Sequence, residues 1–124
     1  MSVAGMFTEY LFSYGTLQLA AVQTATFGRL LAGRADAVPG YAVVPLRIED
    51  ENVVAISGKA VHTMATFSGR ASDVIAGMVF AVSPEEILQA DRYEVAAVKR
   101  VAVVLQSGTR AWIYVDARDA TSGS

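Results

Sequence analysis

Short apolar segments separated by glycine, proline and polar residues dominate this sequence and limit the folds open to it. Segments of this length favour β-strands, whereas only residues 18–31 and 83–94 space their apolar residues as a helix does. One helix follows the first strand and the other precedes a final hairpin. This order favours an α+β fold with a mixed sheet or a small mixed β-barrel flanked by short helices. We expect extended segments at residues 8–14, 37–46, 53–56, 59–67, 73–82, 99–105 and 110–115.

The helix that begins near residue 83 has the clearest local signal in the chain. Ser83 is a favourable N-cap, because its hydroxyl can accept a hydrogen bond from the amide three residues later. Pro84 follows at the first helical position, where its missing N–H costs nothing. Glu86 then completes a capping box with Ser83. We predict a helix from here to about residues 92–94.

Glycine and proline set the limits of two other segments. Gly33 follows the apolar pattern of the first helix and is a plausible residue to end it. Pro39 and Pro45 interrupt the extended segment 37–46. Because proline cannot donate a ladder hydrogen bond, we expect this segment at a sheet edge, a strand end or a bulge.

Two carboxylates of the second helix fall on the face predicted to meet the core. On a wheel of about 100° per residue, Ile87 and Leu88 define the apolar face. Asp91 falls between them, and Glu94 lies nearly in line with Ile87. The opposite, outer face carries Glu85, Glu86, Gln89 and Arg92. A buried carboxylate is costly unless it is bonded or neutral, and burial raises its pKa, which suits a general acid or base near pH 7.

Other interpretations of these carboxylates stay open at this point. The helix can fray before Glu94, or Glu94 can pair with Arg92, Lys99 or Arg100. Asp91 can hold backbone amides, and a structural role beside the site suits it better than a catalytic one.

The turn after the first strand is a second candidate site. Tyr14-Gly15-Thr16-Leu17 joins a buried strand to a helix, and glycine there permits a positive φ or a close backbone approach. Amides that follow such a turn can point into one concavity and hold a carboxylate or a phosphate. An ordinary strand–helix turn is the alternative.

The composition excludes several kinds of partner and site. The 124 residues suit a single domain, with a core at about residues 9–116 and flexible ends. A net charge of −2 leaves no basic stripe for nucleic acid. Cysteine is absent and His62 is the only histidine, so we expect no metal site. Without a basic leader or an apolar run of about 18–20 residues, we expect a cytoplasmic protein with no membrane partner.

Taken in order along the chain, these features resemble the gamma-glutamylcyclotransferase family, with its gamma-glutamylamine cyclotransferase and AIG2-like relatives. The first motif is Phe12-Ser13-Tyr14-Gly15-Thr16-Leu17, and the second is Leu88-Gln89-Ala90-Asp91-Arg92-Tyr93-Glu94. Residues 39–41, 75–80 and 111–114 are similar to further strands of the family. The resemblance therefore covers nearly the whole chain.

The resemblance implies a small mixed β-barrel and the release of 5-oxoproline from a γ-glutamyl compound. It implies that amides around Gly15, Thr16 and Leu17, next to Tyr14, hold the substrate α-carboxylate. Glu94 matches the catalytic glutamate, which passes a proton from the substrate α-amine to the leaving amine. The substrate supplies its own nucleophile, so this chemistry needs no cofactor.

Two departures from the family pattern favour an alternative function. Val95 stands where the family usually has glycine, and residues 96–98 lack the tyrosine that commonly precedes a basic residue. The alternative is a binding module of the same fold that holds a small carboxylate ligand at the turn without turnover. Tyr114 can supply a hydroxyl to the substrate instead, or it can simply pack beside Trp112 in the core.

Overall fold

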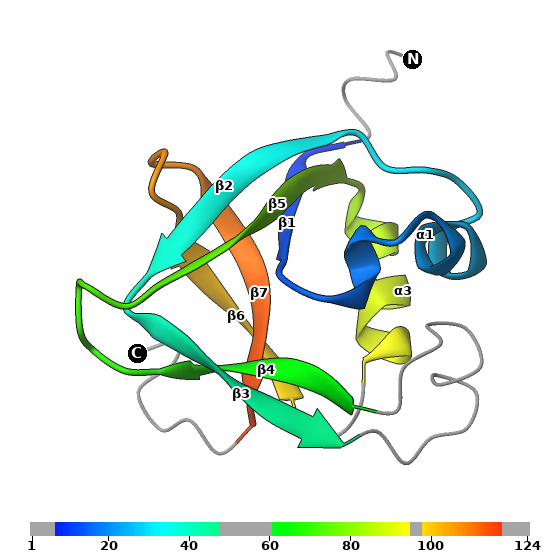
Figure 1. Cartoon of the computed structure of the whole chain (residues 1–124). Coiled ribbons are helices and arrows are strands. Elements are labelled where there is room, and N and C mark those ends of the chain that lie inside the picture. The colour runs from blue at the N-terminus through cyan, green and yellow to red at the C-terminus, as the bar shows by residue number, and fades with distance from the viewer. Residues whose placement is uncertain (1–6, 48–60, 95–97, 118–124) are drawn as a thin grey trace.

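The computed structural model describes residues 7–47, 61–94 and 98–117. The segment expected at 53–56, the departure at Val95 and residues 1–6 and 118–124 of the ends lie outside this part of the chain. Within it, seven strands form one mixed sheet, with the helices gathered at one side (Figure 1). The strands are β1 (Glu9–Ser13), β2 (Gly33–Pro39), β3 (Tyr41–Arg47), β4 (Val61–Phe67), β5 (Val74–Val82), β6 (Val98–Val104) and β7 (Arg110–Asp116).

The sheet confirms the predicted α+β class with mixed strand directions. Its hydrogen-bonded order is β2-β5-β1-β7-β4-β3, and β6 pairs with β7 outside this path. β7 runs parallel to both β1 and β4 and antiparallel to β6. β2 and β3 stand at the two ends of the order, which agrees with an edge position for the proline-containing segment.

A turn at Gly40, not a ladder, connects the two end strands. Gly40 has a φ of 85°, which favours glycine, and it divides the extended segment expected at 37–46, with its interruptions at Pro39 and Pro45, into β2 and β3. Its N–H donates to the Asp73 carbonyl at 2.8 Å, and its own carbonyl accepts from Ser68 and Gly69. Among the described residues no ladder joins β2 to β3, so the sheet is not closed and the predicted barrel is not confirmed.

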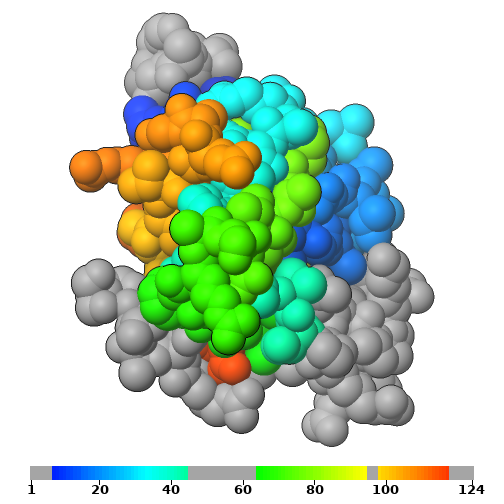
Figure 2. Space-filling view, turned by 60° about the vertical axis from the view of Figure 1, so that its left-hand side comes forward, coloured from blue at the N-terminus to red at the C-terminus, as the bar shows by residue number. Residues whose placement is uncertain are grey.

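The connection between β4 and β5 lies against this turn. In the space-filling view its green atoms occupy the centre of the visible face, near the cyan atoms of β2 and the teal atoms of β3 (Figure 2). The hydrogen bonds of Gly40 therefore tie the ends of the sheet order to a segment that lies beside both of them.

Apolar residues fill both faces of the central strands. Leu11 and Phe12 are neighbours in β1 and point to opposite faces, and both are almost fully buried. A strand that is buried on both faces has no polar alternation, which explains the continuous apolar run at the start of the chain. One face packs Phe12 with Val38, Tyr41, Ala65, Ile75, Val79 and Ile113; the other packs Leu11 with Leu17, Val22, Phe80, Val82, Ile87, Ala90 and Tyr114.

The first helical segment is shorter than predicted. It consists of the 3-10 helix η2 (Thr16–Gln18) and the helix α1 (Ala20–Phe27). Gly28, with a φ of 74°, ends α1 and donates its N–H to the Thr24 carbonyl. Gly33 was therefore the wrong stop residue, since it begins β2. A glycine in the left-handed conformation ends the helix, and the sequence offers two glycines within five residues.

The second helix, α3 (Pro84–Tyr93), begins as predicted. The Ser83 hydroxyl accepts from the Glu86 N–H at 3.1 Å, and Glu86 Oε1 accepts from the Ser83 N–H at 2.9 Å. The capping box is thus complete. Among the described helices, none combines the length and the apolar character that crossing a bilayer would require.

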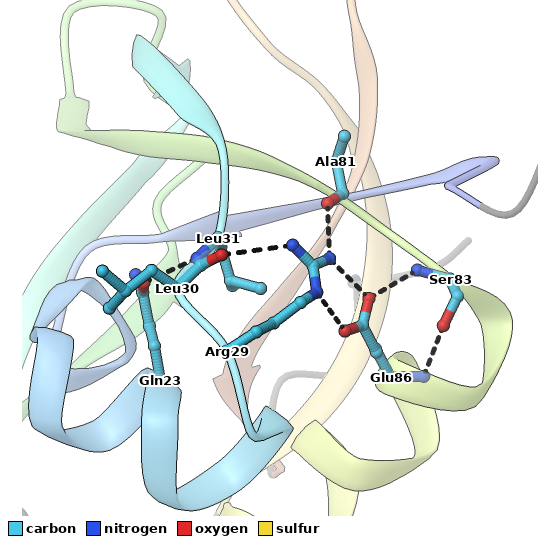
Figure 3. Close-up of polar contacts among 7 residues, drawn as sticks. All are labelled: Gln23, Arg29, Leu30, Leu31, Ala81, Ser83 and Glu86. Atoms are coloured by element: carbon cyan, nitrogen blue, oxygen red, sulfur yellow. Dashed lines mark hydrogen bonds and ion pairs between the residues drawn. The ribbon is translucent and has the colours of Figure 1, made fainter. Parts of the chain in front are cut away.

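The buried face of α3 differs from the predicted one. Ile87 and Ala90 are buried, but Leu88 is 54% exposed and Glu86, placed on the outer face by the wheel, is buried. Arg29 explains the burial of Glu86, because its Nε and Nη2 donate to the carboxylate at 2.7 and 2.8 Å (Figure 3). An ion pair with two hydrogen bonds removes most of the cost of burying this carboxylate.

Candidate active site

Tyr14 lies at a fork in the sheet, which is the place where β1 and β4, both paired with β7, diverge from each other. β1 pairs with β7 at Trp112, and β4 pairs with the same edge of β7 at Val115. The Tyr14 hydroxyl fills the gap between them: it donates to the Tyr114 carbonyl at 2.5 Å and accepts from the Ala65 N–H at 2.8 Å. Because β1 and β4 diverge here, these two backbone groups have no partner in a neighbouring described strand, and the Tyr14 hydroxyl takes the place of that partner. Burial raises the pKa of Tyr14 well above its usual value, so the hydroxyl stays protonated.

The turn that follows Tyr14 contains two backbone N–H groups that donate no hydrogen bond within the turn itself. The first bond of η2 runs from Gln18 N–H to the Gly15 carbonyl, so the N–H groups of Thr16 and Leu17 have no acceptor within the turn. Gly15 donates its own N–H to the Ser13 hydroxyl at 3.3 Å. Its φ of −137° is not positive, and a Cβ there would meet nothing within 4 Å. Glycine at this position therefore keeps open space beside the backbone, whereas a positive φ is not the reason for it.

Glu94 is the residue at which α3 ends. Its N–H donates to the Ala90 carbonyl at 3.0 Å, and its ψ of 151° turns the chain out of the helix, so the helix does not fray before it. Burial raises the pKa of Glu94 to about 7, and the negative charge of Asp91 adds to this effect. In the described part of the chain, no side chain forms a hydrogen bond or an ion pair with its carboxyl group.

Three tyrosines lie near enough to Glu94 to respond to its charge. The charge of Glu94 contributes to the raised pKa of Tyr14, Tyr93 and Tyr114, after burial in each case. The hydroxyls of Tyr93 and Thr16 lie 2.7 Å apart, which links the end of α3 to the turn after β1. The fold therefore brings together the two motifs that lie about eighty residues apart in the sequence.

Asp91 is held by two side chains from the last two strands. Arg100 donates to it through Nε at 2.8 Å and through Nη2 at 3.1 Å, and the Tyr114 hydroxyl donates at 2.7 Å. Burial opposes ionisation of Asp91, but these hydrogen bonds and the charge of Arg100 outweigh it, so its pKa lies below the usual value. Arg100 thus pairs with Asp91 and not with Glu94, and Asp91 binds side chains instead of backbone amides.

Sequence reasoning missed two residues of this arrangement. Tyr93 lies inside the second motif, directly before Glu94, and this position was the available signal. Arg100 was considered only as a partner of Glu94. Tyr114 is buried on the helix-facing side of the sheet, and its hydroxyl still reaches a polar partner on α3.

Metal ligands and grooves add little to the site. Within residues 7–47, 61–94 and 98–117, no three His, Asp or Glu side chains lie close enough to hold a metal ion. The backbone of His62 belongs to β4, but its side chain is outside the described atoms. A shallow groove beside Tyr14 is lined by residues 41–43 and 72–76, and Glu94 does not line it.

One family model matches most of the chain. Residues 11–123 match the family model described as gamma-glutamyl cyclotransferase, AIG2-like. No curated protein sequence matches the chain significantly.

Solved structures share the fold at low sequence identity. A solution structure of an Arabidopsis thaliana protein has a TM-score of 0.67 and 19% identity over 90% of this chain and 64% of its own. A second one from Arabidopsis thaliana has a TM-score of 0.66 and 18% identity over 90% and 70%. The crystal structure of an uncharacterized protein from Pyrococcus horikoshii has a TM-score of 0.57 and 19% identity over 94% and 80%. This chain thus spans less than two thirds of the first of these structures.

Proposed function

The chain belongs to the gamma-glutamyl cyclotransferase, AIG2-like family, and we propose that it releases 5-oxoproline from a γ-glutamyl amine, dipeptide or related compound. One observation carries this proposal. A carboxyl group with a pKa of about 7, free of described partners, lies at the end of α3, which the Thr16–Tyr93 contact links to the turn after β1. A general base works best when its pKa is near the working pH.

The reaction needs one internal attack and one proton shuttle. Glu94 takes a proton from the substrate α-ammonium, and the freed amine forms a bond to the γ-carbonyl carbon. The original γ-amide C–N bond then breaks. Glu94 returns this proton to the departing nitrogen, and the second proton that the ring nitrogen loses also passes to it, so the amine leaves as an ammonium and no net proton is gained or lost. Holding the γ-glutamyl chain in a bent form supplies the entropic advantage of an oriented attack.

The neighbouring residues have distinct proposed roles. The amides around Gly15, Thr16 and Leu17 hold the substrate α-carboxylate, since two of them have no acceptor within the turn. Tyr14 directly precedes this turn, and its proposed role is to border the bound substrate. The hydroxyl proton of Tyr114 is directed to Asp91, so toward a substrate this hydroxyl acts as an acceptor, which suits an ammonium group.

The test is 5-oxoproline release from a panel of γ-glutamyl compounds by the wild type and Glu94→Gln. We expect the substitution to lower the rate by about 10²–10⁴ while leaving the fold intact, because glutamine cannot accept the proton. Glu85→Gln is the matched control, since Glu85 lies on the exposed first turn of the same helix. Equal rates for wild type and Glu94→Gln would remove Glu94 from the mechanism.

A non-catalytic binding module is the second candidate. Val95 and the missing tyrosine in residues 96–98 are the observations that favour it. This function requires saturable binding of a γ-glutamyl ligand without any product from the same panel. Binding measured by calorimetry beside the product assay separates the two candidates.

A further inference from the structure

We propose that Arg100 is a positioning residue for Glu94: it holds the Asp91 carboxylate in place one helical turn before Glu94 and so sets the negative charge that Glu94 experiences. The inference rests on the proposed role of Glu94 as the acid–base group. It adds a residue on β6 that contacts neither Glu94 nor the turn after β1 in any bond described above.

Arg100 contacts both oxygens of the Asp91 carboxylate, and we call this arrangement the clamp. Its two donors approach the two oxygens of Asp91 at 2.8 and 3.1 Å, and its guanidinium stacks 4.3 Å from the centre of the Trp112 ring. Trp112 is itself held by a hydrogen bond to Glu9 at 3.0 Å. A planar fork fixed by stacking orients a carboxylate better than a flexible ammonium can.

The clamp acts at a short distance from Glu94. Asp91 and Glu94 are three residues apart, and side chains at this spacing are neighbours on a helix face. The Tyr114 hydroxyl holds Asp91 from the side of β7. The carboxylate is thus fixed from two strands, and it cannot turn toward solvent without losing three hydrogen bonds.

The ionisable groups that face Glu94 in the described residues come from three elements. Asp91 and Tyr93 belong to α3, Tyr14 follows β1, and Tyr114 belongs to β7. The tyrosines are neutral near pH 7 because each pKa is raised. Asp91 is therefore the charged member of this group, and Arg100 is its partner.

Opposite effects follow for the two ends of the ion pair. Asp91→Asn removes the negative charge beside Glu94, so Glu94 should lose its proton more easily. Arg100→Gln removes the positive charge that offsets Asp91, so Glu94 should hold its proton more tightly. In the Asp91→Asn background, Arg100→Gln should raise the midpoint less than it does in the wild type, because only the direct effect of the Arg100 charge on Glu94 is left.

The experiment is an NMR titration of the ¹³C-labelled Glu94 carboxyl in the wild type, the two single variants and the double variant. We expect the midpoint to fall by about one pH unit in Asp91→Asn and to rise in Arg100→Gln. Arg92→Gln is the matched control: it removes the same charge from an exposed residue beside Asp91, and it should move the midpoint less. Arg100→Lys should give a midpoint between those of the wild type and Arg100→Gln, because lysine keeps the charge but not the planar fork.

Each result decides the proposal. Midpoints that stay unchanged, that move in the same direction, or that move equally in Arg92→Gln would overturn it. A shift from Arg100→Gln that is as large without Asp91 as with it would also overturn it. If Arg100→Gln does not fold, Arg100→Lys and Asp91→Asn carry the test. The titration needs no turnover, so opposite shifts in a protein that releases no 5-oxoproline would support the clamp and refute the proposed function.

Discussion

Removing the hydroxyl of Tyr14 should destabilise the fold through two orphaned backbone groups. Tyr14→Phe keeps the ring but deletes the partner of the Ala65 N–H and of the Tyr114 carbonyl. Ala65 is fully buried and Tyr114 is 6% exposed, so water has little access to either group. The loss is therefore larger than that of a solvent-exposed hydrogen bond.

The magnitude follows from the cost of an unpaired buried group. Each such group costs about 1–3 kcal/mol, so the two together reduce the free energy of unfolding by roughly 2–6 kcal/mol. Since a domain of this kind is stable by about 5–15 kcal/mol, the loss is a large fraction of the total. In urea the midpoint should fall by roughly 1–3 M at a slope of about 2 kcal/mol per M.

The assay is equilibrium unfolding in urea, with Tyr10→Phe as the matched control. Tyr10 lies on the same strand and is 38% exposed, and the same hydroxyl is removed without orphaning a described backbone group. A Tyr14→Phe loss below about 1 kcal/mol, or equal to that of Tyr10→Phe, would refute the fork argument. Lost turnover with unchanged stability would instead indicate direct contact between the hydroxyl and substrate.

Two further predictions concern packing and pH. Gly77→Ala should lower the free energy of unfolding in urea by about 1–3 kcal/mol, because its Cβ would lie 2.8 Å from the Phe12 ring and against the Ser13 carbonyl. Gly15→Ala is the control: a Cβ there meets open space, so stability should stay unchanged. The pKa of Glu86 is lowered: burial raises it, but hydrogen bonds from Arg29 and Ser83 outweigh burial. Its contribution to stability is therefore present above its usual value of 4.5 and is lost as the pH falls through the lower folded value. The free energy of unfolding of Arg29→Gln should decrease less than that of the wild type over this pH range. An unchanged pH profile would contradict the ion pair's role.

Local signals in the sequence predicted the elements whose causes are local. The start of α3 needs only Ser83, Pro84 and Glu86, which contact one another within one turn, and this start was correct. The end of the first helix was wrong because Gly28 and Gly33 carry the same local signal. The positive φ at Gly28 depends on where the following chain must go.

The helix wheel succeeded or failed according to partners that lie far away in the chain. It placed Glu94 near the core, and the carboxyl there is desolvated enough to raise its pKa. It placed Glu86 in solvent, because nothing nearby in sequence announces that Arg29, 57 residues away, lies beside it. A helical wheel predicts the direction in which a side chain points, but it does not predict which charged residue from elsewhere in the chain lies there.

The sequence by itself determined the α+β class, the capping box of α3 and the two motifs that contain Tyr14 and Glu94. These depend on residue type and on spacing within one element. Only the tertiary structure decided that Tyr14 bridges two diverging strands, that Arg100 holds Asp91, and that no ladder joins β2 to β3 among the described residues. Each of these depends on contacts between residues distant in the chain, whose energies are set by burial and by mutual geometry. Periodicity and composition carry no information about either.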